Sequence, residues 1–369
     1  MVISGTGLYT PPDVIDNEQL VASFNAYTAA HNDAHAAEIA AGVRPALAFS
    51  SAEFIEKASG IRQRHVLDSC GILDTSRMYP RFPQRADDDL SLQAEIAVAA
   101  AREALQQAGR QSADIDLVIC AASSMQRSFP AISIEIQNAL GIEGSAYDMT
   151  MACSSATFGI EQAANAIRSG TARAVLLVIP EVYSARLAWH DRDCHFIFGD
   201  ACSAVVIERA DEARAGSWEI LDTRTRTRFS NAIRNNFGPF NRCEDSDPAA
   251  RDKLFRQQGR RVFKEVCPMV VEHVGTHLAE LDLTPTAIRR FWLHQANATM
   301  NHYIVKHLLG REPHADEAPS MLAEYGNTAA VGSLMAFHFH RHDLAAGSTG
   351  IICSFGAGYS VGSIIVRRL

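Results

Sequence analysis

The sequence has no excess of positive charge and no long apolar run. Of its 369 residues 42 are acidic and 34 basic, which leaves a net charge of −8. This acidic balance argues against a protein that holds nucleic acid over a broad surface. No apolar run reaches the roughly 18 to 20 residues of a membrane helix, and the N-terminal stretch lacks the pattern of a signal peptide. We therefore expect a cytoplasmic protein that binds neither nucleic acid nor membranes.

Cysteines are few, and their spacing shows no pairing. The eight cysteines include no Cys-x-x-Cys pair and no Cys/His cluster at the spacing of metal ligands. The pattern fits neither a disulfide framework nor a zinc site, so no metal is expected. Each cysteine is interpreted as a free thiol, and most such thiols are small buried hydrophobic groups.

The composition is globular, and strand signals alternate with helix signals. Continuous apolar runs predict strands buried on both faces, and Ala-rich stretches between them predict helices. The strand runs are 117–120, 174–179, 204–207 and 350–353, and the helical stretches include 92–108 and 157–168. This alternation predicts an α/β protein with helices on both sides of its sheets.

The chain contains an internal similarity at an offset of 174 residues. This offset places Cys153 over Asn327 and Cys120 over His294. In each half an apolar strand precedes a small-residue segment that opens a helix. We interpret the halves, 1–210 and 211–369, as two copies of one βα unit. A chance likeness between two ordinary α/β segments is the alternative.

Two segments fall outside the repeated unit. Residues from about 20 to 55 resemble an inserted helical excursion, which is either a lid or a surface decoration. The stretch from Asp222 to Pro248 carries Arg, Asn, Gly and Pro and is interpreted as a connector between the halves.

Three residues of the two halves are candidates for one catalytic site. Cys153 lies where a short strand passes into a helix, and the dipole and free amides of such a turn favour a thiolate nucleophile. His294 follows an apolar strand, and Asn327 precedes the corresponding helix of the second half. Taken singly, they could be an inert cysteine, a satisfied core histidine and a helix cap. The repeat favours a site because it brings all three to one interface.

Six short motifs run through the chain in a fixed order. They are SGIRQRH at 59–65, ACSS at 152–155, FGDA at 198–201, HQAN at 294–297, GNT at 326–328 and SFGAG at 354–358. In content, order and spacing they resemble the 3-oxoacyl-[acyl carrier protein] synthase III family of thiolase-fold condensing enzymes, over nearly the whole chain. The resemblance implies a thiolase-like fold of two pseudo-symmetric βα halves in five layers, α-β-α-β-α, and a homodimer.

The resemblance also implies a mechanism and its residues. Cys153, His294 and Asn327 would form the triad, and the amides of Cys153 and Ala357 the oxyanion hole, with Gly356 beside the substrate. Cys153 would take an acyl group from acyl-coenzyme A, and malonyl-[acyl carrier protein] would then condense with it as carbon dioxide leaves, as in fatty acid biosynthesis. Coenzyme A is a substrate in this scheme, and no cofactor is implied.

Further matched positions concern the acyl chain and coenzyme A. Phe129 matches a residue that reaches across the dimer to wall the partner's acyl pocket, with an ordinary dimer-core aromatic as the alternative. Asn297 and Arg192 match substrate contacts. Phe54 replaces a tryptophan that stacks on adenine, and Ala58 replaces an arginine of the same site. We therefore expect weaker contacts to coenzyme A.

The expected contact with the carrier protein departs from the family in the same way. Thr299 stands where the family has a basic docking residue, although Lys264, Arg260, Arg261 and Lys306 could keep a positive rim for an acidic carrier. Charge runs of this kind are also common on ordinary solvated faces.

The absence of one carboxylate bears on the reaction type. Related enzymes that join two acyl chains without decarboxylation carry a glutamate base near Phe129, and none occurs from Ser123 to Pro130, although Glu135 follows six residues on. Decarboxylative condensation is favoured, and the helical segment before Ser50 favours a medium-chain primer. The alternatives are acyl transfer to an oxygen or nitrogen of a specialised metabolite, and a non-catalytic partner subunit.

Overall fold

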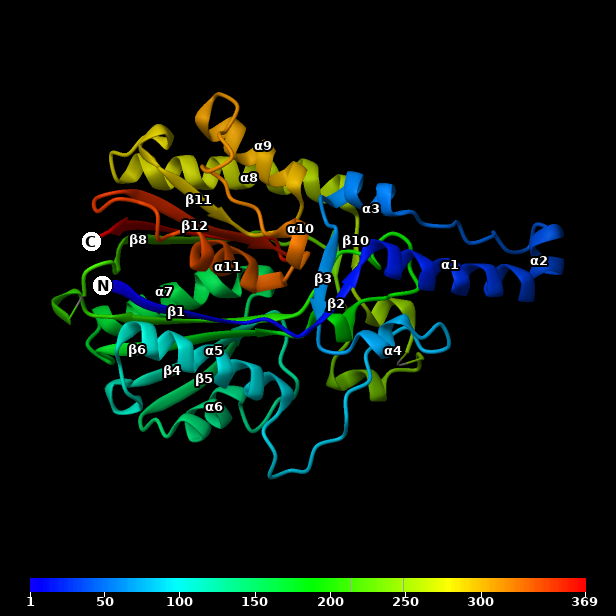
Figure 1. Ribbon diagram of the computed structural model, residues 1–369, viewed down its shortest axis with the longest axis horizontal. Helices are drawn as coiled ribbons and strands as arrows, with labels where there is room; N and C mark the ends of the chain where they lie inside the picture. The colour runs from blue at the N-terminus through cyan, green and yellow to red at the C-terminus, as the bar shows by residue number, and fades with distance from the viewer. Residues whose placement is uncertain (213, 248) are drawn as a thin grey trace.

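The molecule is built in five layers. The computed structural model describes residues 1–212, 214–247 and 249–369. Two helices lie between two sheet halves, and a pair of helices covers each outer face (Figure 1). The central helices are α7 (Ser155–Arg168) and α11 (Gly332–Phe339); the outer ones are α5 (Leu92–Ala108), α6 (Ile132–Leu140), α8 (Gly259–Glu280) and α9 (Ala298–Leu309). This arrangement confirms the predicted α/β class and its layered order.

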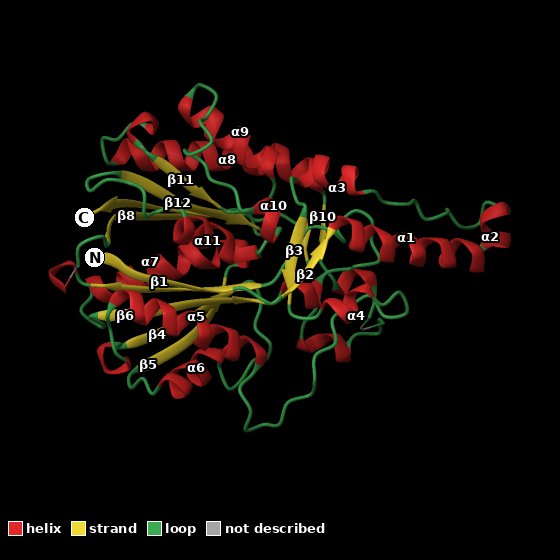
Figure 2. Ribbon diagram, viewed as in Figure 1, coloured by secondary structure: helices red, strands yellow, loops and turns green. Residues whose placement is uncertain are grey.

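The strands follow the order β11-β12-β13-β8-β1-β7-β6-β4-β5, and Figure 2 shows the two halves they form. The halves are joined where Val2 and Ile3 pair with Glu219 and Trp218. Parallel pairing occurs in both halves: β4 pairs with β5 and β6, and β11 pairs with β12. The strands are β1 (Val2–Tyr9), β4 (Leu117–Ala122), β5 (Ser145–Thr150), β6 (Ala174–Glu181), β7 (Ala201–Glu208), β8 (Trp218–Thr227), β11 (Arg290–Leu293), β12 (Thr349–Gly356) and β13 (Ser360–Arg368).

The apolar runs of the sequence form the centre of these sheets. Every residue of β4, β6 and β7 is buried, because helices cover both faces of the strands. Small residues of α5 let this helix lie close against β1, where a methyl group on Gly7 would meet the Ala100 carbonyl oxygen at 2.0 Å. The prediction of doubly buried strands is confirmed.

A helical arm extends from the body at residues 17–51 (Figure 1). It comprises α1 (Asn17–Ala34), α2 (Ala36–Ala40) and an extended return to α3 (Ala52–Ser59). Two asparagines of α1 bind the returning backbone in matched pairs. Asn25 bonds the amide and carbonyl of Ser50 at 2.8 and 3.1 Å, and Asn32 bonds those of Leu47 at 2.8 and 3.0 Å. The arm is therefore held together by its own hydrogen bonds.

The remaining short elements lie at the end of the body near the arm. They include two small two-stranded antiparallel ribbons and two short helices. They are β2 (Asp13–Asp16) with β3 (Gln63–Val66), β9 (Ile233–Arg234) with β10 (Arg256–Gln257), α4 (Ser69–Leu73) and α10 (Leu322–Tyr325).

The predicted connector from Asp222 to Pro248 was wrong in its first part. Residues 222–227 belong to β8 and pair antiparallel with β13. Here β-branched threonines alternate with arginines, a pattern that suits a strand. Arg224 and Arg226 form ion pairs with Glu280 and Glu272 of α8. Pro248 lies outside the described residues.

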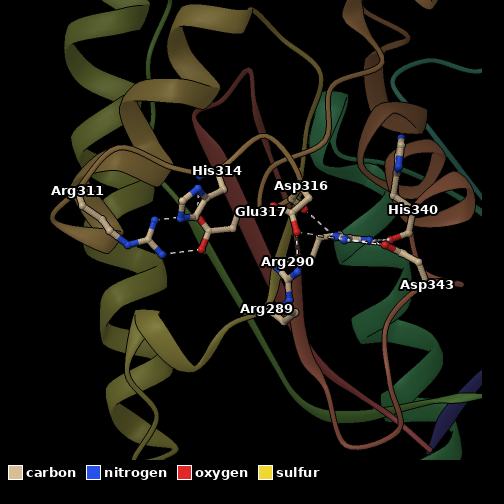
Figure 3. Close-up of polar contacts among 8 residues, drawn as sticks. All are labelled: Arg289, Arg290, Arg311, His314, Asp316, Glu317, His340 and Asp343. Carbon is tan, nitrogen blue, oxygen red and sulfur yellow. Dashed lines mark hydrogen bonds and ion pairs between the residues drawn. The ribbon is translucent and has the colours of Figure 1, made fainter.

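The base of β11 is fixed by a cluster of ion pairs, shown in Figure 3. Arg290, 2% exposed, donates to both carboxylate oxygens of Asp343 at 2.6 and 3.0 Å. Its remaining donors bond the backbone carbonyls of Asp316 and His340, each at 2.8 Å. This charged side chain is thus fully paired where the strand begins, at the opposite end from His294.

Candidate active site

A pocket of about 500 Å³ brings the three predicted catalytic residues together. Cys153, His294 and Asn327 all line it. Most of the other walls are apolar, and they include Phe196, Phe198, Phe255, Phe263, Val266 and Phe355. A pocket of this kind can hold an aliphatic chain next to a few polar groups.

Cys153 lies on a tight turn between β5 and α7. The turn is a short 3-10 helix, η2 (Ala152–Ser154), and Ala152 has a φ of 46°. The Ser155 hydroxyl accepts from the Met151 amide at 2.9 Å and donates to the Ala122 carbonyl at 3.0 Å, which ties the turn to the end of β4. A strained residue before a nucleophile is typical of strand-to-helix nucleophile turns.

The second half contains the same turn, with a register that differs from the sequence alignment. It is η8 (Ala329–Val331), where Ala329 has a φ of 49°, and it leads directly into α11. The counterpart of Ala152 is therefore Ala329, an offset of 177 residues, and the predicted pairing of Cys153 with Asn327 is displaced by three. The sequence alignment did not reveal this shift, because it was based on the apolar strands, which align at offsets close to 174.

The expectation of a thiolate at Cys153 was wrong. Burial, and then the negative charge of Glu181, raise the pKa of the Cys153 thiol to about 12. The helix N-terminus does not outweigh this loss of solvation. Cys153 is thus a neutral thiol at pH 7, and the proton must leave when the sulfur attacks.

Backbone from the second half lies directly against the nucleophile. A methyl group built on Gly356 would meet the Cys153 Cβ at 2.7 Å and its Sγ at 3.3 Å. Glycine is therefore required here by contact and not by backbone conformation. This approach also brings the turn that contains Ala357 next to the sulfur.

His294 follows the last residue of β11 and is almost fully buried. Its amide donates to the Cys353 carbonyl at 2.7 Å, and its carbonyl accepts from Asn301 Nδ2 at 3.0 Å. The ring stands edge-on to Phe355, with centroids 5.3 Å apart. Burial lowers the pKa of His294 to about 4, opposed by a hydrogen bond to the backbone of Ala329. The imidazole is therefore neutral near pH 7.

Asn327 is held between the halves by its own backbone. Its amide donates to the Ile197 carbonyl at 2.9 Å, and its carbonyl accepts from the Gly199 amide at 3.1 Å. The side-chain Oδ1 accepts from the Ala329 amide at 2.9 Å, but the N-cap of η8 is Thr328, so Asn327 does not occupy the capping position that the sequence suggested. Because Oδ1 is used as an acceptor, Nδ2 is the group that can donate to a ligand.

Sequence reasoning missed one buried group beside this site, Glu181 at the end of β6. Its carboxylate accepts from the Ser123 amide at 2.7 Å, from the Ser123 hydroxyl and from the Ala330 amide at 3.3 Å. Burial raises the pKa of Glu181 to about 7. A lone acid that closes an otherwise apolar strand was the available signal.

The expected substrate contacts fall in two places. Asn297 lines the pocket, caps α9 and donates to the Ala58 carbonyl at 2.6 Å, so it joins α3 to α9 at the mouth. Arg192 and Phe54 lie outside the lining residues. The Arg192 guanidinium stacks on the Phe54 ring at 4.0 Å and donates to the Phe49 carbonyl at 2.7 Å. These two side chains are in contact with each other, and the arm holds the pair.

Phe129 does not line the catalytic pocket of its own chain. Its side chain is 84% exposed and borders a second cavity of about 840 Å³. Glu135, the one acid noted near this position, pairs with Arg127 and accepts from the Ser91 amide at 2.8 Å. It is not among the residues that line the catalytic pocket.

Of the four basic residues expected to contact a carrier protein, two line the catalytic pocket and two form ion pairs with nearby glutamates. Arg260 and Lys264, on the first turns of α8, line the catalytic pocket. Arg261 forms an ion pair with Glu265, and Lys306 on α9 forms one with Glu312. The pocket thus has two basic residues in its wall.

No group of three or more His, Cys, Asp or Glu side chains within the described residues could hold a metal ion. In the same part of the chain, no helix combines the length and apolar character needed to cross a membrane.

Comparison with known proteins matches this chain to one family. Models of 3-oxoacyl-[acyl-carrier-protein] synthase III and of its C-terminal part match residues 147–228 and 278–368. A beta-ketodecanoyl-[acyl-carrier-protein] synthase from Pseudomonas aeruginosa is 55% identical, over 94% of this chain and 99% of its own. A beta-ketoacyl-[acyl-carrier-protein] synthase III from Chelativorans sp. is 30% identical, over 86% of this chain and 91% of its own.

The solved structures agree in fold. The 3-oxoacyl-[acyl-carrier-protein] synthase III of Aquifex aeolicus superposes with a TM-score of 0.77 at 23% identity, covering 99% of both chains. Together, fold and sequence define a thiolase-fold condensing enzyme. The chain belongs to the 3-oxoacyl-[acyl carrier protein] synthase III family.

Proposed function

We propose that this chain is a β-ketoacyl-[acyl carrier protein] synthase that extends a medium-chain acyl primer with malonyl-[acyl carrier protein]. The observation that carries the proposal is the joint presence of Cys153, His294 and Asn327 in one largely apolar pocket. The medium-chain assignment is supported by the Pseudomonas aeruginosa relative, whose name specifies a ten-carbon product.

The first step transfers the acyl group to Cys153. The sulfur attacks the thioester carbonyl of acyl-coenzyme A, a new thioester forms, and the carbon–sulfur bond to coenzyme A breaks. The thiol proton passes to the departing thiolate, with neutral His294 able to carry it. Backbone amides of Cys153 and Ala357 stabilise the oxyanion of this step, and contact at Gly356 supports that placement.

The second step forms the carbon–carbon bond. The malonyl group loses carbon dioxide, and the enolate oxygen takes hydrogen bonds from His294 and from Asn327 Nδ2. The enolate carbon attacks the acyl carbonyl, and Cys153 leaves as a thiolate that regains a proton. An uncharged amide suits this step because it stabilises the enolate without competing for a proton.

We also propose a homodimer with each chain divided near residue 210 into two units. The end strand β5 has no neighbour on its outer side among the described strands, and its residues alternate between exposed and partly buried. An open strand edge and the exposed aromatic side chain of Phe129 both suit contact with a second copy. An acidic carrier would approach Arg260 and Lys264 at the pocket mouth.

The test follows each step by intact mass. Octanoyl-coenzyme A should add one acyl group to the wild-type protein and none to Cys153→Ala. Malonyl-[acyl carrier protein] should then discharge the group with release of carbon dioxide. A protein that stays unmodified would contradict the proposal and favour a non-catalytic partner, whereas discharge without carbon dioxide would favour acyl transfer to another nucleophile.

A further inference from the structure

We propose that Glu181 is a positioning residue that holds the Asn327 turn against the Cys153 turn. The inference rests on the proposed function, because its main test follows the discharge of an acyl group from Cys153.

Glu181 joins the two halves at their interface. It closes β6 of the first half and is 1% exposed. One carboxylate oxygen accepts from the Ser123 amide at 2.7 Å and from the Ala330 amide at 3.3 Å, and the other accepts from the Ser123 hydroxyl. Ser123 follows the last residue of β4, and Ala330 belongs to η8 of the second half.

The bond to Ala330 fixes the segment that carries Asn327. Ala329, with a φ of 49°, gives its amide to the Asn327 side chain, and the next amide goes to Glu181. A residue in this conformation persists when its neighbours hold it. Glu181 is therefore an anchor that the first half supplies to the strained turn itself, in addition to the bonds of Ile197 and Gly199 to the Asn327 backbone.

The electrostatics of the site agree with this placement. After burial, the negative charge of Glu181 is the second cause that raises the pKa of the Cys153 thiol. The titratable or charged groups around Glu181 and Cys153 are Arg186, Tyr183, Cys120, Cys202 and His294.

Two substitutions at position 181 separate the placement of the side chain from its charge. Glu181→Gln keeps the shape, keeps an oxygen for the two amides and gives the Ser123 hydroxyl a donor, but it removes the charge. Glu181→Asp keeps the charge but withdraws the carboxylate by one methylene from Ala330. A buried acid with a matching environment provides the control. Asp200 accepts hydrogen bonds from the Ser184 amide, the Ser184 hydroxyl and the Leu67 amide. Unlike Glu181, it does not contribute to the raised pKa of Cys153.

Cys153 alkylation by iodoacetamide, read at its own peptide by mass spectrometry at pH 8, shows whether the cysteine turn itself is disturbed. We expect Glu181→Asp and Asp200→Asn to be alkylated at the wild-type rate, because both keep a carboxylate at position 181. Peptide-level detection is needed because Cys70 and Cys243 are exposed free thiols. A loss of alkylation in Glu181→Asp would place its effect in the cysteine turn and overturn the positioning role.

Discharge of the acyl group by malonyl-[acyl carrier protein] reports positioning. We expect Glu181→Asp to slow discharge at least about tenfold with acylation within about threefold of wild type, and Glu181→Gln to stay within about threefold in both steps. Equal losses in both variants would overturn the positioning role. If wild-type protein is never acylated, the proposed function fails. If it is acylated and Glu181→Asp discharges at the wild-type rate, only the positioning role fails.

Discussion

Gly356 and Cys153 touch so closely that no side chain fits between them. A Cβ on Gly356 would lie 2.7 Å from the Cys153 Cβ, 3.2 Å from its amide nitrogen and 3.3 Å from its sulfur. The contact joins β12 of the second half to the nucleophile turn of the first. The position of the sulfur therefore depends on the packing of the two halves against each other.

The substitution Gly356→Ala should displace the nucleophile. Because an added methyl group must move Cys153 or the strand, we expect acylation by octanoyl-coenzyme A to fall by about a hundredfold in a protein that remains folded. The matched control is Gly275→Ala in α8, where a Cβ meets nothing within 4 Å. That variant should acylate at the wild-type rate, and equal behaviour of the two variants would refute the argument.

Asn327→Ala should separate the two chemical steps. Loss of Nδ2 removes a donor to the enolate oxygen, while the cysteine turn keeps its own contacts. We expect acylation to proceed and condensation to slow by about a hundredfold or more. Rapid-quench mass measurement of the acyl enzyme, with and without malonyl-[acyl carrier protein], gives both rates. A parallel loss of acylation would assign Asn327 to the first step or to the shape of the pocket.

Sequence periodicity predicts much of this fold, because β4, β6 and β7 are buried on both faces and so appear as continuous apolar runs. It fails at β8, where Thr223 and Thr225 alternate with arginines that pair with α8. The three pocket residues could be singled out because each follows or precedes a regular element. Glu181 could be noticed as a lone acid at the end of an apolar strand. Its role could not be predicted, since it depends on Ser123 and Ala330, which the fold brings to it from both halves.

The pKa of Cys153 also could not be derived from local sequence. A helix N-terminus is visible in the pattern of residues 152–156, and it favours a thiolate. The burial of the sulfur and the approach of Glu181 are set by tertiary packing, and both favour the thiol. Burial has the larger effect on the pKa of Cys153, and it cannot be derived from the local sequence.

Asp200 should make stability fall as the pH rises. Burial raises the pKa of this carboxyl to about 6, against about 3.9 in an unfolded chain. The folded state therefore holds the proton more tightly, and stability declines between pH 4 and 6 and then levels off. Asp200→Asn removes this contribution. Relative to wild type, we expect the variant to gain about 2 kcal/mol in unfolding free energy between pH 4 and 7.

Urea unfolding at a series of pH values measures this difference directly. The comparison uses the change with pH and not the absolute stability, because the amide alters the hydrogen bonds to Ser184 at every pH. Parallel pH profiles for the two proteins would show that Asp200 does not retain its proton in the folded state.

Arg290→Ala should destabilise the second half without touching the chemistry. The substitution leaves the Asp316 carbonyl without its donor, leaves the His340 carbonyl with the Trp292 indole alone, and removes the paired bonds to Asp343 (Figure 3). Because Arg290 is buried and fully paired, we expect the free energy of unfolding to drop by about 3 kcal/mol. Its neighbour provides the control, since Arg289 is half exposed and pairs with an exposed Asp316 carboxylate. Arg289→Ala should cost less than about 1 kcal/mol, because exposed ion pairs contribute little. Urea titrations of both variants decide the point, and equal losses would place the stabilising effect in the charge of the cluster instead of in the buried contacts that begin β11.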